Sequence, residues 1–251
     1  MIIARAKIGG QEKYCVVKGV EFYPIEGDIY GEFSIGQTPV KTDGLLCPAR
    51  PSKILALGVN YVSHAEEMKH QMPTAPIVFM KPVTALVGPG EKIVYPKKAG
   101  TVHYEAELAI VVGKKCRKVK RSQALEYVFG YTCANDVSER NFQKQDGQWT
   151  RAKGYDTFCP VGPYIVTDID AGALEVKAVL NGETVQQGNT RDLINDVPAI
   201  VEWVSEIMTL CPGDLILTGT PKGVGEIKPG DEIEINIEKI GSLKNTVIAE
   251  D

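Results

Sequence analysis

The sequence predicts an α+β fold, because strand-like segments outnumber helical ones and do not alternate with them regularly. Short apolar runs bounded by Gly, Pro and Asp recur along all 251 residues, as they do in proteins built from strands. Only two longer segments, 122–130 and 196–210, carry apolar residues at helical spacing. We therefore expect few helices around a large mixed sheet or sandwich.

The first 50 residues differ in character from the rest of the chain. They alternate β-like runs with Gly and Asp turns, as in "YCVVKGVEFYPIEGDIYGEF", and they end at the Pro-rich joint "CPARPSK". This change predicts a small N-terminal β-rich domain over residues 1–50 and a larger domain over residues 51–251.

The larger domain is expected to mix extended runs with three helices. "KILALGVNY", "IVFMKP" and "TALVG" are strand-like, whereas "SHAEEMKH" predicts a short helix with Ser63 as its N-cap. A second helix is expected over 122–130. The third has Asp196 as its cap and Pro198 in its first turn. The Pro-Gly pairs that open "PGDLILTGT" and "PGDEIEINIE" predict type II turns, each leading into a strand.

Composition and charge describe an ordinary soluble globule. The net charge is −4, and the one basic cluster, 114–121, is typical of a polar loop or edge strand, so we expect no nucleic-acid partner. The chain lacks an apolar stretch of about 18 residues, and "MIIARAKIGG" lacks a signal-peptide core, so we expect no membrane partner. The six cysteines are scattered without a C-x-x-C pair, as in a reduced cytoplasmic protein.

The stretch "TVHYEAELAIVVG" (101–113) places polar side chains at regular intervals in an apolar strand. Side chains at every second position share a face, so His103, Glu105 and Glu107 point the same way. Two carboxylates about 7 Å apart along a strand repel each other unless a cation neutralises them. A solvated edge strand and a metal site both explain this pattern. The apolar tail "LAIVVG" favours a buried strand.

A hard divalent cation such as Mg²⁺ or Mn²⁺ takes oxygen ligands, commonly two or three carboxylates with water and substrate. Glu105 and Glu107 supply two carboxylates. Asp136 is the best candidate for a third, because it follows the extended run "YVFGYTCAN" and can lie at the end of a neighbouring strand. A turn or a helix N-cap is the alternative role for Asp136.

These carboxylates occur together with further motifs, and the combination resembles the fumarylacetoacetate hydrolase (FAH) family. The family's E-x-E metal motif corresponds to Glu105-Ala106-Glu107, and its downstream Asp corresponds to Asp136. His103 is a departure, because many members carry Asp there. The resemblance extends from about residue 50 to the end, and residues 1–50 resemble the small N-terminal domain of many bacterial members. The further matching segments are "GVNYVSHAEEM" (58–68), "FMKPVTALVG" (79–88), "WTRAKGYDTFCPVGP" (149–163) and "TGTPKGVG" (218–225).

The resemblance implies an FAH-type mixed β-sandwich roll, a homodimer and an enzyme that acts on 2-oxo and 2,4-dioxo acids. It implies that Glu105, Glu107 and Asp136 hold Mg²⁺ or Mn²⁺. A metal held there would stabilise the enolate that forms when a bond next to the substrate carbonyl breaks.

Three catalytic residues follow from the matched positions. Lys153 in "RAKGYD" would stabilise negative charge on the substrate or pass a proton to the leaving carbanion. His64 and Glu67 match the dyad that activates water in hydrolase-type members, with Glu67 orienting the imidazole. Glu66 is a rival to Glu67, and an exposed pair on a solvated helix is the structural alternative.

Arg140, Gln143 and Thr220 match substrate-binding positions of the family. The spacing of Arg140 and Gln143 places them on one face of a helical turn. A structural Arg140, paired with Asp136 or Glu139, is the alternative. "TGTPKGVG" lacks the order of a phosphate-binding loop, and we expect the Thr220 hydroxyl and nearby backbone N–H groups to meet a substrate carboxylate.

Three functions are consistent with this sequence. The leading one is hydrolysis of the C–C bond of acylpyruvates, or decarboxylation of oxaloacetate-type acids. The second is a 2-hydroxyhepta-2,4-diene-1,7-dioate isomerase or 5-oxopent-3-ene-1,2,5-tricarboxylate decarboxylase of aromatic catabolism. The dyad favours hydrolysis, because isomerisation needs no activated water. The third is a non-catalytic calcium-binding β protein, against which Lys153 argues. We expect residues 64–76 to form a lid that selects the substrate.

Overall fold

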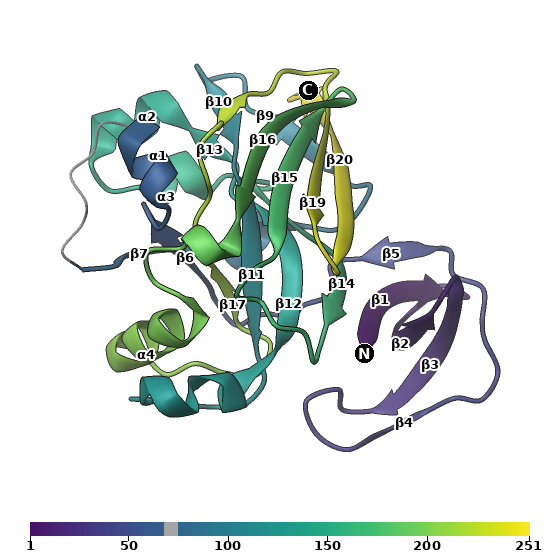
Figure 1. Cartoon of the computed structure of the whole chain (residues 1–251). Coiled ribbons are helices and arrows are strands. Elements are labelled where there is room, and N and C mark those ends of the chain that lie inside the picture. The colour runs from purple at the N-terminus through teal and green to yellow at the C-terminus, as the bar shows by residue number, and fades with distance from the viewer. Residues whose placement is uncertain (68–74) are drawn as a thin grey trace.

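The computed structural model describes residues 1–67 and 75–251, and its centre is a large mixed sheet (Figure 1). The strands of this sheet are β1 (Ile2–Ile8), β2 (Gln11–Lys18), β3 (Glu21–Gly27), β4 (Phe33–Ile35), β5 (Gly44–Leu46), β6 (Ile54–Gly58), β7 (Ile77–Lys81), β8 (Leu86–Val87), β11 (Ala106–Val112), β12 (Val128–Asn135), β14 (Cys159–Val166) and β17 (Leu215–Leu217). Their order is β4-β3-β2-β1-β14-β12-β11-β17-β6-β7, with β5 beside β1 and β8 beside β14.

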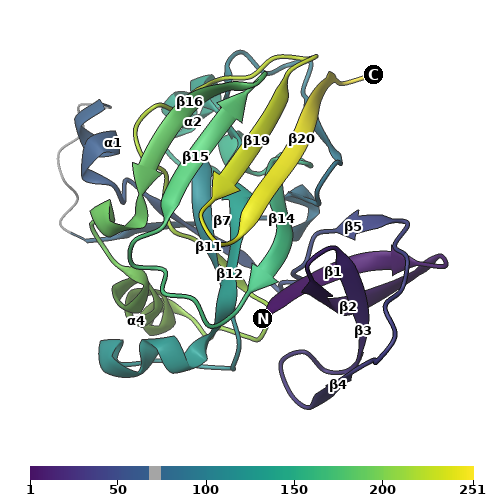
Figure 2. The same ribbon diagram turned by 45° about the vertical axis from the view of Figure 1, so that its right-hand side comes forward.

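A second sheet covers one face of β11, β12 and β14 (Figure 2). It consists of β9 (Lys92–Tyr95), β15 (Glu175–Leu180), β16 (Glu183–Asn189), β19 (Glu232–Ile237) and β20 (Gly241–Ala249), in the order β16-β15-β19-β20-β9. A small third sheet joins β10 (Val102–Tyr104) to β13 (Ser138–Glu139) and β18 (Gly225–Glu226). The layers form the mixed β-sandwich with few helices that the sequence predicts.

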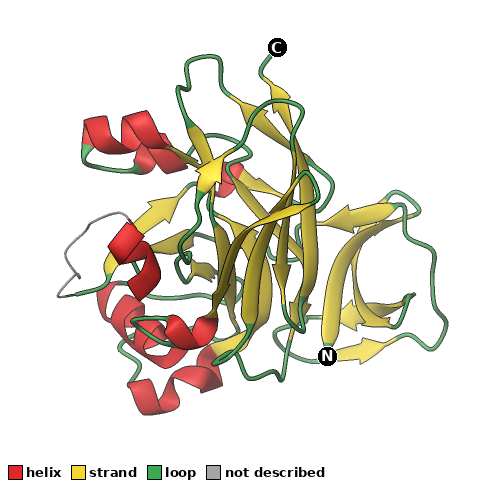
Figure 3. Cartoon of the chain, turned by 45° about the horizontal axis from the view of Figure 1, so that its top comes forward, coloured by secondary structure: helices red, strands yellow, loops and turns green. Residues whose placement is uncertain are grey.

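The helices gather on one side of the sandwich (Figure 3). They are α1 (Val62–Glu67), α2 (Arg140–Asp146), α3 (Thr150–Lys153), α4 (Val197–Ile207) and the 3₁₀ helices η1 (Val83–Ala85), η2 (Arg121–Tyr127) and η3 (Thr190–Asp192). α4 confirms its predicted start, because the Asp196 carboxylate accepts a hydrogen bond from Ala199 N at 3.0 Å. The two Pro-Gly turns are also confirmed, with positive φ at Gly213 and Gly230.

β11 is buried on both faces, and its side chains alternate between two apolar cores. Leu108 and Ile110 belong to the core between the two sheets, together with Ile235 of β19. Ala109 and Val111 belong to a second core on the opposite face of the large sheet. The alternation predicted for 101–113 is therefore confirmed, and a solvated edge strand is excluded for β11.

Three local expectations are wrong. The segment expected as a helix over 122–130 is the 3₁₀ helix η2 followed by β12, because Val128 already pairs with Val112 of β11. Ser63 is not an N-cap: α1 begins one residue earlier, at Val62. "TALVG" is not all extended, since η1 occupies its first part. Residues 68–70 of the expected helix "SHAEEMKH" lie outside the described residues.

Strands β1 to β4, from the predicted N-terminal domain, lie to one side of the sandwich (Figures 1 and 2). They are not separate from it in hydrogen bonding, because Ile2 and Ile3 of β1 pair with Val166 and Ile165 of β14. The boundary at residue 50 stays a prediction. Within residues 1–67 and 75–251, no helix is long and apolar enough to cross a membrane. All six cysteines are free.

Candidate metal and substrate site

Three buried carboxylates meet where β10 gives way to β11. Glu105 lies between these two strands, Glu107 lies in β11, and Asp136 follows β12. The pairing of β11 with β12 places Ala106 opposite Asn135, and Asp136 N donates to Glu105 O at 3.0 Å. One ligand oxygen from each carboxylate lies within 4.8 Å of the other two. Their side chains are no more than 6% exposed, so they do not face bulk water.

Two buried lysines pair with members of this acidic triad, which consists of Glu105, Glu107 and Asp136. Lys153 at the end of α3 donates to Glu105 Oε2 at 2.8 Å and to Asp136 Oδ2 at 2.5 Å. Lys81 at the end of β7 donates to the other oxygen of Asp136, Oδ1, at 2.5 Å, and to a backbone carbonyl. Asp136 therefore bridges two ammonium groups.

Arg140 provides the third cation and contacts Glu105, not Asp136 or Glu139. Its Nη2 donates to Glu105 Oε1 at 2.5 Å, and its Nη1 donates to Gln143 Oε1 at 2.8 Å. The predicted shared face of Arg140 and Gln143 is thus present. Glu139, not Asp136, caps α2 by accepting from the backbone N–H of the first turn, so the cap alternative for Asp136 is excluded.

The carboxylates of the triad differ in their proton affinity. Burial alone would raise the pKa of Glu105, but Lys153 and Arg140 outweigh it and hold that pKa well below its ordinary value. Burial, together with the charges of Asp136 and Glu105, raises the pKa of Glu107 well above its ordinary value. The Glu107 carboxylate accepts from Gly219 N at 2.6 Å. Glu107 is thus the carboxylate with the least compensation.

The donor set fits a hard divalent cation. All three groups of the triad are carboxylates that offer oxygen, and neither His nor Cys belongs to the described cluster. Oxygen ligands suit Mg²⁺ and Mn²⁺, whereas zinc and copper sites are rich in imidazole and thiolate. A cation at the shared point would also relieve the mutual repulsion that raises the pKa of Glu107.

His64 and Glu67 of α1 lie beside this site. His64 is 7% exposed, and its Nδ1 lies 3.5 Å from Glu67 Oε2. Burial lowers the pKa of His64, against the opposing charges of Glu105 and Glu67. Both Glu67 oxygens accept from Gly223 N, at 3.0 and 3.1 Å. Glu67, and not Glu66, approaches the imidazole among the described contacts, so the geometry favours Glu67 as the partner of His64.

Thr220 is nearby, but its hydroxyl already has partners. Thr220 Oγ1 donates to Ala106 O at 2.9 Å and accepts from Gln186 Nε2 at 2.7 Å. The hydroxyl would therefore have to leave Ala106 in order to donate to a substrate carboxylate. In this structure the side chain ties the 218–225 loop to the E-x-E segment.

Unsatisfied polar atoms gather around the triad. Seven buried side-chain polar atoms lack a hydrogen-bond partner among the described residues, and five of these are at or next to the triad. Asn135 and Arg140 contact Glu105, and the negative charge of Glu107 acts on Tyr61. Buried polar groups normally have partners, so this concentration indicates a place for a polar ligand. The five atoms are Tyr61 Oη, His64 Nδ1, His103 Nδ1, Asn135 Nδ2 and Arg140 Nε.

Comparison with known proteins agrees with this geometry. A family model described as fumarylacetoacetate (FAA) hydrolase C-terminal matches residues 53–248. The chain belongs to the FAH family. Members of this family are enzymes and typically depend on a divalent metal.

Relatives within the FAH family carry several activities. A 2,4-didehydro-3-deoxy-L-rhamnonate hydrolase of Sphingomonas is 45% identical over 207 residues, which are 78% of this chain and 73% of the relative. The mitochondrial oxaloacetate tautomerase of Rattus norvegicus is 40% identical over 210 residues, 79% of this chain and 67% of the relative. The crystal structure of a 2-hydroxyhepta-2,4-diene-1,7-dioate isomerase from Mycobacterium marinum matches with TM-score 0.92 and 44% identity, covering 100% and 99% of the two chains.

Sequence reasoning missed two residues of this FAH site, Lys81 and Gln186. Lys81 was inside the matched segment "FMKPVTALVG", but nothing local shows that its side chain turns inward to Asp136. The spacing in β7 offers one signal: Lys81 falls on the same face as Phe79, and the Lys153 ammonium also lies 5.1 Å from the Phe79 ring centre.

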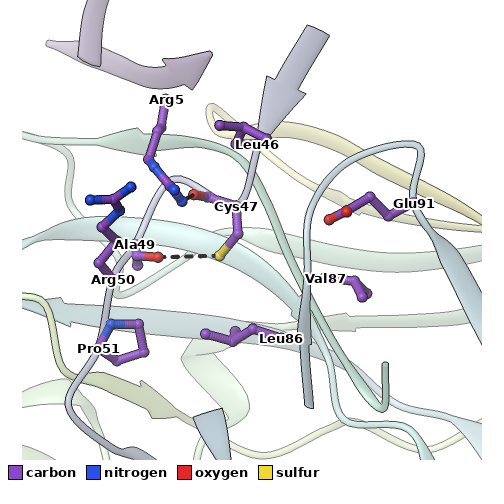
Figure 4. A pocket seen from close by; sticks show the side chains of 9 residues that line it. All are labelled: Arg5, Leu46, Cys47, Ala49, Arg50, Pro51, Leu86, Val87 and Glu91. Carbon is purple, nitrogen blue, oxygen red and sulfur yellow. Dashed lines mark hydrogen bonds between the residues drawn. The ribbon is translucent and has the colours of Figure 1, made fainter. Parts of the chain in front are cut away.

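A hollow lies away from the FAH site, near the junction of β1 and β5 (Figure 4). Its lining includes Arg5, whose Nη1 donates to Cys47 O at 3.0 Å, and Arg50. Glu12 pairs with both guanidinium groups. None of the triad carboxylates lines this pocket, so we do not assign the chemistry to it.

Proposed function

We propose that this protein is a Mg²⁺- or Mn²⁺-dependent enzyme that acts on 2-oxo and 2,4-dioxo acids through an enolate. The favoured activity is hydrolysis of the C–C bond of acylpyruvates, with decarboxylation of oxaloacetate-type acids as a related outcome. One observation carries the proposal: three buried carboxylates converge, and three buried cations pair with two of them, Glu105 and Asp136.

The charge balance of the site supports an enolate. With Glu107 ionised, as a metal ligand would be, the three triad carboxylates carry −3 and Lys81, Lys153 and Arg140 carry +3, so these six side chains sum to zero. A divalent cation would bring the site to +2. The carboxylate and enolate oxygens of an ionised 2-oxo acid together carry −2. A buried site compensates such a dianion best when its own charge is equal and opposite.

The cationic side chains have separate roles in this proposal. When bound, the cation would supply Lewis-acid stabilisation of negative charge on the substrate oxygens. Lys153 stabilises the same developing charge, since its ammonium is buried beside Glu105 and Asp136. Lys81 holds Asp136 in place. Arg140 and Gln143 offer donors to a substrate carboxylate from α2.

Hydrolysis also requires an activated water, and His64 with Glu67 supplies the base. Burial lowers the pKa of His64, so the imidazole is neutral at pH 7 and can accept a proton from water. Glu67 Oε2 lies 3.5 Å from Nδ1 without forming a hydrogen bond in this structure, and in the proposal it turns to Nδ1 so that Nε2 accepts that proton. Water would attack the carbonyl carbon distal to the enolate, and the bond between that carbon and the enolate carbon would break.

An isomerase or tautomerase is the second candidate. The isomerase structure with TM-score 0.92 and the oxaloacetate tautomerase favour it, because both named reactions move a proton next to a carbonyl. Such a reaction uses the metal site and Lys153 but needs no activated water. A non-catalytic calcium protein is disfavoured, because three buried cations beside the triad serve a reacting anion better than a structural ion. We also propose a cytoplasmic homodimer, on the resemblance to bacterial members.

A substrate panel with His64→Ala separates the two enzymatic candidates. With Mg²⁺, the wild type is tested on acetylpyruvate, fumarylpyruvate, oxaloacetate and a hydroxymuconate-type dienoate. His64→Ala should lose cleavage of the acylpyruvates by about a hundredfold or more, the scale of a lost general base. It should still exchange the C3 protons of a slow 2-oxo acid with deuterated solvent. Full cleavage by His64→Ala would remove the dyad from the mechanism and favour the isomerase.

A further inference from the structure

Gln186 of β16 connects two backbone segments of the site. Its Oε1 accepts from Ala106 N at 3.0 Å, and its Nε2 donates to Thr220 Oγ1 and to Pro221 O, both at 2.7 Å. Gln186 is 2% exposed. Both amide N–H groups and the amide oxygen are thus engaged in a place that water does not reach.

The segment that Gln186 holds is the centre of the E-x-E motif. β11 pairs with β17 only from Ala109 to Val111, so the backbone before Ala109 has no strand on that edge. The side chains of Gln186 and Thr220 form hydrogen bonds with the Ala106 backbone there. Ala106 N donates to Gln186 Oε1, and Ala106 O accepts from the Thr220 hydroxyl. Gln186 Nε2 in turn donates to that same hydroxyl. The three groups form a closed ring of hydrogen bonds around the peptide between the two metal-binding glutamates.

The close approach of β16 to the 218–225 loop shows that this connection is tightly packed. A Cβ on Gly188, two residues after Gln186, would lie 2.4 Å from Pro221 Cβ. Only glycine therefore allows β16 to come this near the loop. Gly219 of the same loop donates to Glu107 Oε2 at 2.6 Å, so a shift of the loop would reach a triad carboxylate directly.

We propose that Gln186 is a positioning residue, which together with Thr220 fixes the Glu105-Ala106-Glu107 backbone so that both glutamates converge with Asp136. This inference rests on the proposed metal site. Loss of the Gln186 amide leaves Ala106 N–H buried without an acceptor, and this destabilises the fold unless the backbone moves. Movement of the backbone separates the carboxylates that the cation requires.

The test compares metal binding by Gln186→Met and Gln187→Met. Met resembles Gln in length but cannot form the ring of hydrogen bonds. Gln187 is the matched control, since it is the next residue of β16 and is exposed, with its amide on Glu175 of β15. Titration with Mn²⁺, followed by electron paramagnetic resonance, should show affinity about tenfold or more weaker in Gln186→Met, the scale of lost outer-shell support. Gln187→Met should match the wild type.

Thr220→Val supplies a second, independent variant, because it removes the hydroxyl that links Gln186 to Ala106 O. The double variant should bind Mn²⁺ no more weakly than the worse single variant, since both act through one ring. Thr220→Val alone carries the test if Gln186→Met does not fold. Wild-type affinity in Gln186→Met, equal losses in Gln187→Met, or fully additive losses would overturn the positioning role. A wild type that binds no Mn²⁺ would overturn the metal site itself.

Discussion

Glu107 is the triad carboxylate that a bound cation would relieve most. Glu105 has ion pairs with Lys153 and Arg140, whereas among the described residues Glu107 accepts only a backbone hydrogen bond, from Gly219. Burial and the neighbouring carboxylates raise the pKa of Glu107 as a result. Without a metal, the free-energy cost of an ionised carboxylate in this site is therefore largest at Glu107.

Replacing Glu107 by Gln should weaken Mg²⁺ binding by about tenfold or more. Loss of a residue that only orients a ligand already has an effect of this size, and Glu107 is itself a proposed ligand. The fold should stay intact, and thermal stability without metal should not fall, because like-charge repulsion is removed. Calorimetric titration and thermal unfolding measure the two effects. Glu226→Gln, at an exposed glutamate of β18, is the control. Wild-type Mg²⁺ affinity in Glu107→Gln would contradict the metal assignment.

The pH dependence of cleavage should report on His64. A general base must be neutral, and burial lowers the pKa of His64 from 6.5, so activity should persist below pH 6.5 and fall only as the imidazole gains a proton. Glu67 acts in the opposite direction and raises that pKa. Glu67→Gln should therefore move the acidic limb of kcat/KM to still lower pH, and Glu66→Gln should not. A limb above pH 6.5 in the wild type would exclude His64 as the base.

The alternating strand pattern pointed to Glu105 and Glu107 and offered Asp136 as a third ligand, and the family resemblance supplied Lys153 and Arg140, but not all of their partners were predicted. Lys81 was missed because its partner Asp136 is 55 residues away, and that ion pair follows from how β6 and β7 close the sheet. Gln186 was missed for the same physical reason. A polar residue in a strand with exposed neighbours has no local feature that marks it as buried.

At the scale of elements, α1 is joined to the 218–225 loop through Glu67. Gly223 N donates to both carboxylate oxygens of Glu67. Val62 at the start of α1 is 45% exposed, so the helix is anchored on its inner side only. The lid expected over 64–76 extends beyond α1 into residues outside the described range, and its closure stays a prediction.

If α1 closes over a bound substrate, the Gly223 amide should exchange with solvent more slowly when oxalate and Mg²⁺ are added. Oxalate mimics the chelating end of the enolate, and a closed helix keeps Glu67 on Gly223. Hydrogen exchange resolved by NMR measures this amide. In Glu67→Ala the slowing should disappear, while the Ala109 amide in β11 should behave the same in both proteins. Identical Gly223 exchange with and without oxalate would argue against closure.

Elements with strong periodicity were predictable, and those decided by tertiary pairing were not. α4 has a capping Asp196, Pro198 in its first turn and an apolar stripe, so its sequence specifies it alone. The segment 122–130 has similar apolar spacing, but pairing of Val128 with β11 takes its last three residues into β12. Such a competition between a local helix and a distant strand is not visible in local sequence.

For the whole molecule, the two apolar cores bury several cysteine and tyrosine side chains in their neutral forms. Burial raises the pKa of Cys47 to about 11 and that of Cys159 to about 12. It likewise raises the pKa of Tyr131 to about 12. These groups lie in the apolar cores on both faces of the large sheet. The folded protein thus keeps protons that the unfolded chain releases at alkaline pH.

The free energy of unfolding should therefore fall above pH 9. Between the ordinary pKa of 9.0 and the raised pKa of about 11, unfolded Cys47 is ionised while folded Cys47 is not. Each such group lowers the unfolding free energy by about 1.4 kcal/mol per pH unit in its window and has no effect below it. Urea unfolding at pH 8, 9 and 10 measures the slope. In Cys47→Ala the unfolding free energy should fall less steeply with pH, by the contribution of one thiol. A slope equal to that of the wild type would contradict a Cys47 thiol that is buried and neutral in the folded protein.

The most direct test of metal-dependent enolate formation is exchange of the C3 protons of 2-oxobutyrate with deuterated water, followed by NMR. The wild-type protein with Mg²⁺ should remove the C3 proton signal, because enolate formation releases that proton whether or not a C–C bond later breaks. Exchange should stop when a chelator removes the metal and resume when Mg²⁺ is restored. Exchange that continues unchanged in the chelator, or that does not occur with bound metal, would contradict the proposed function.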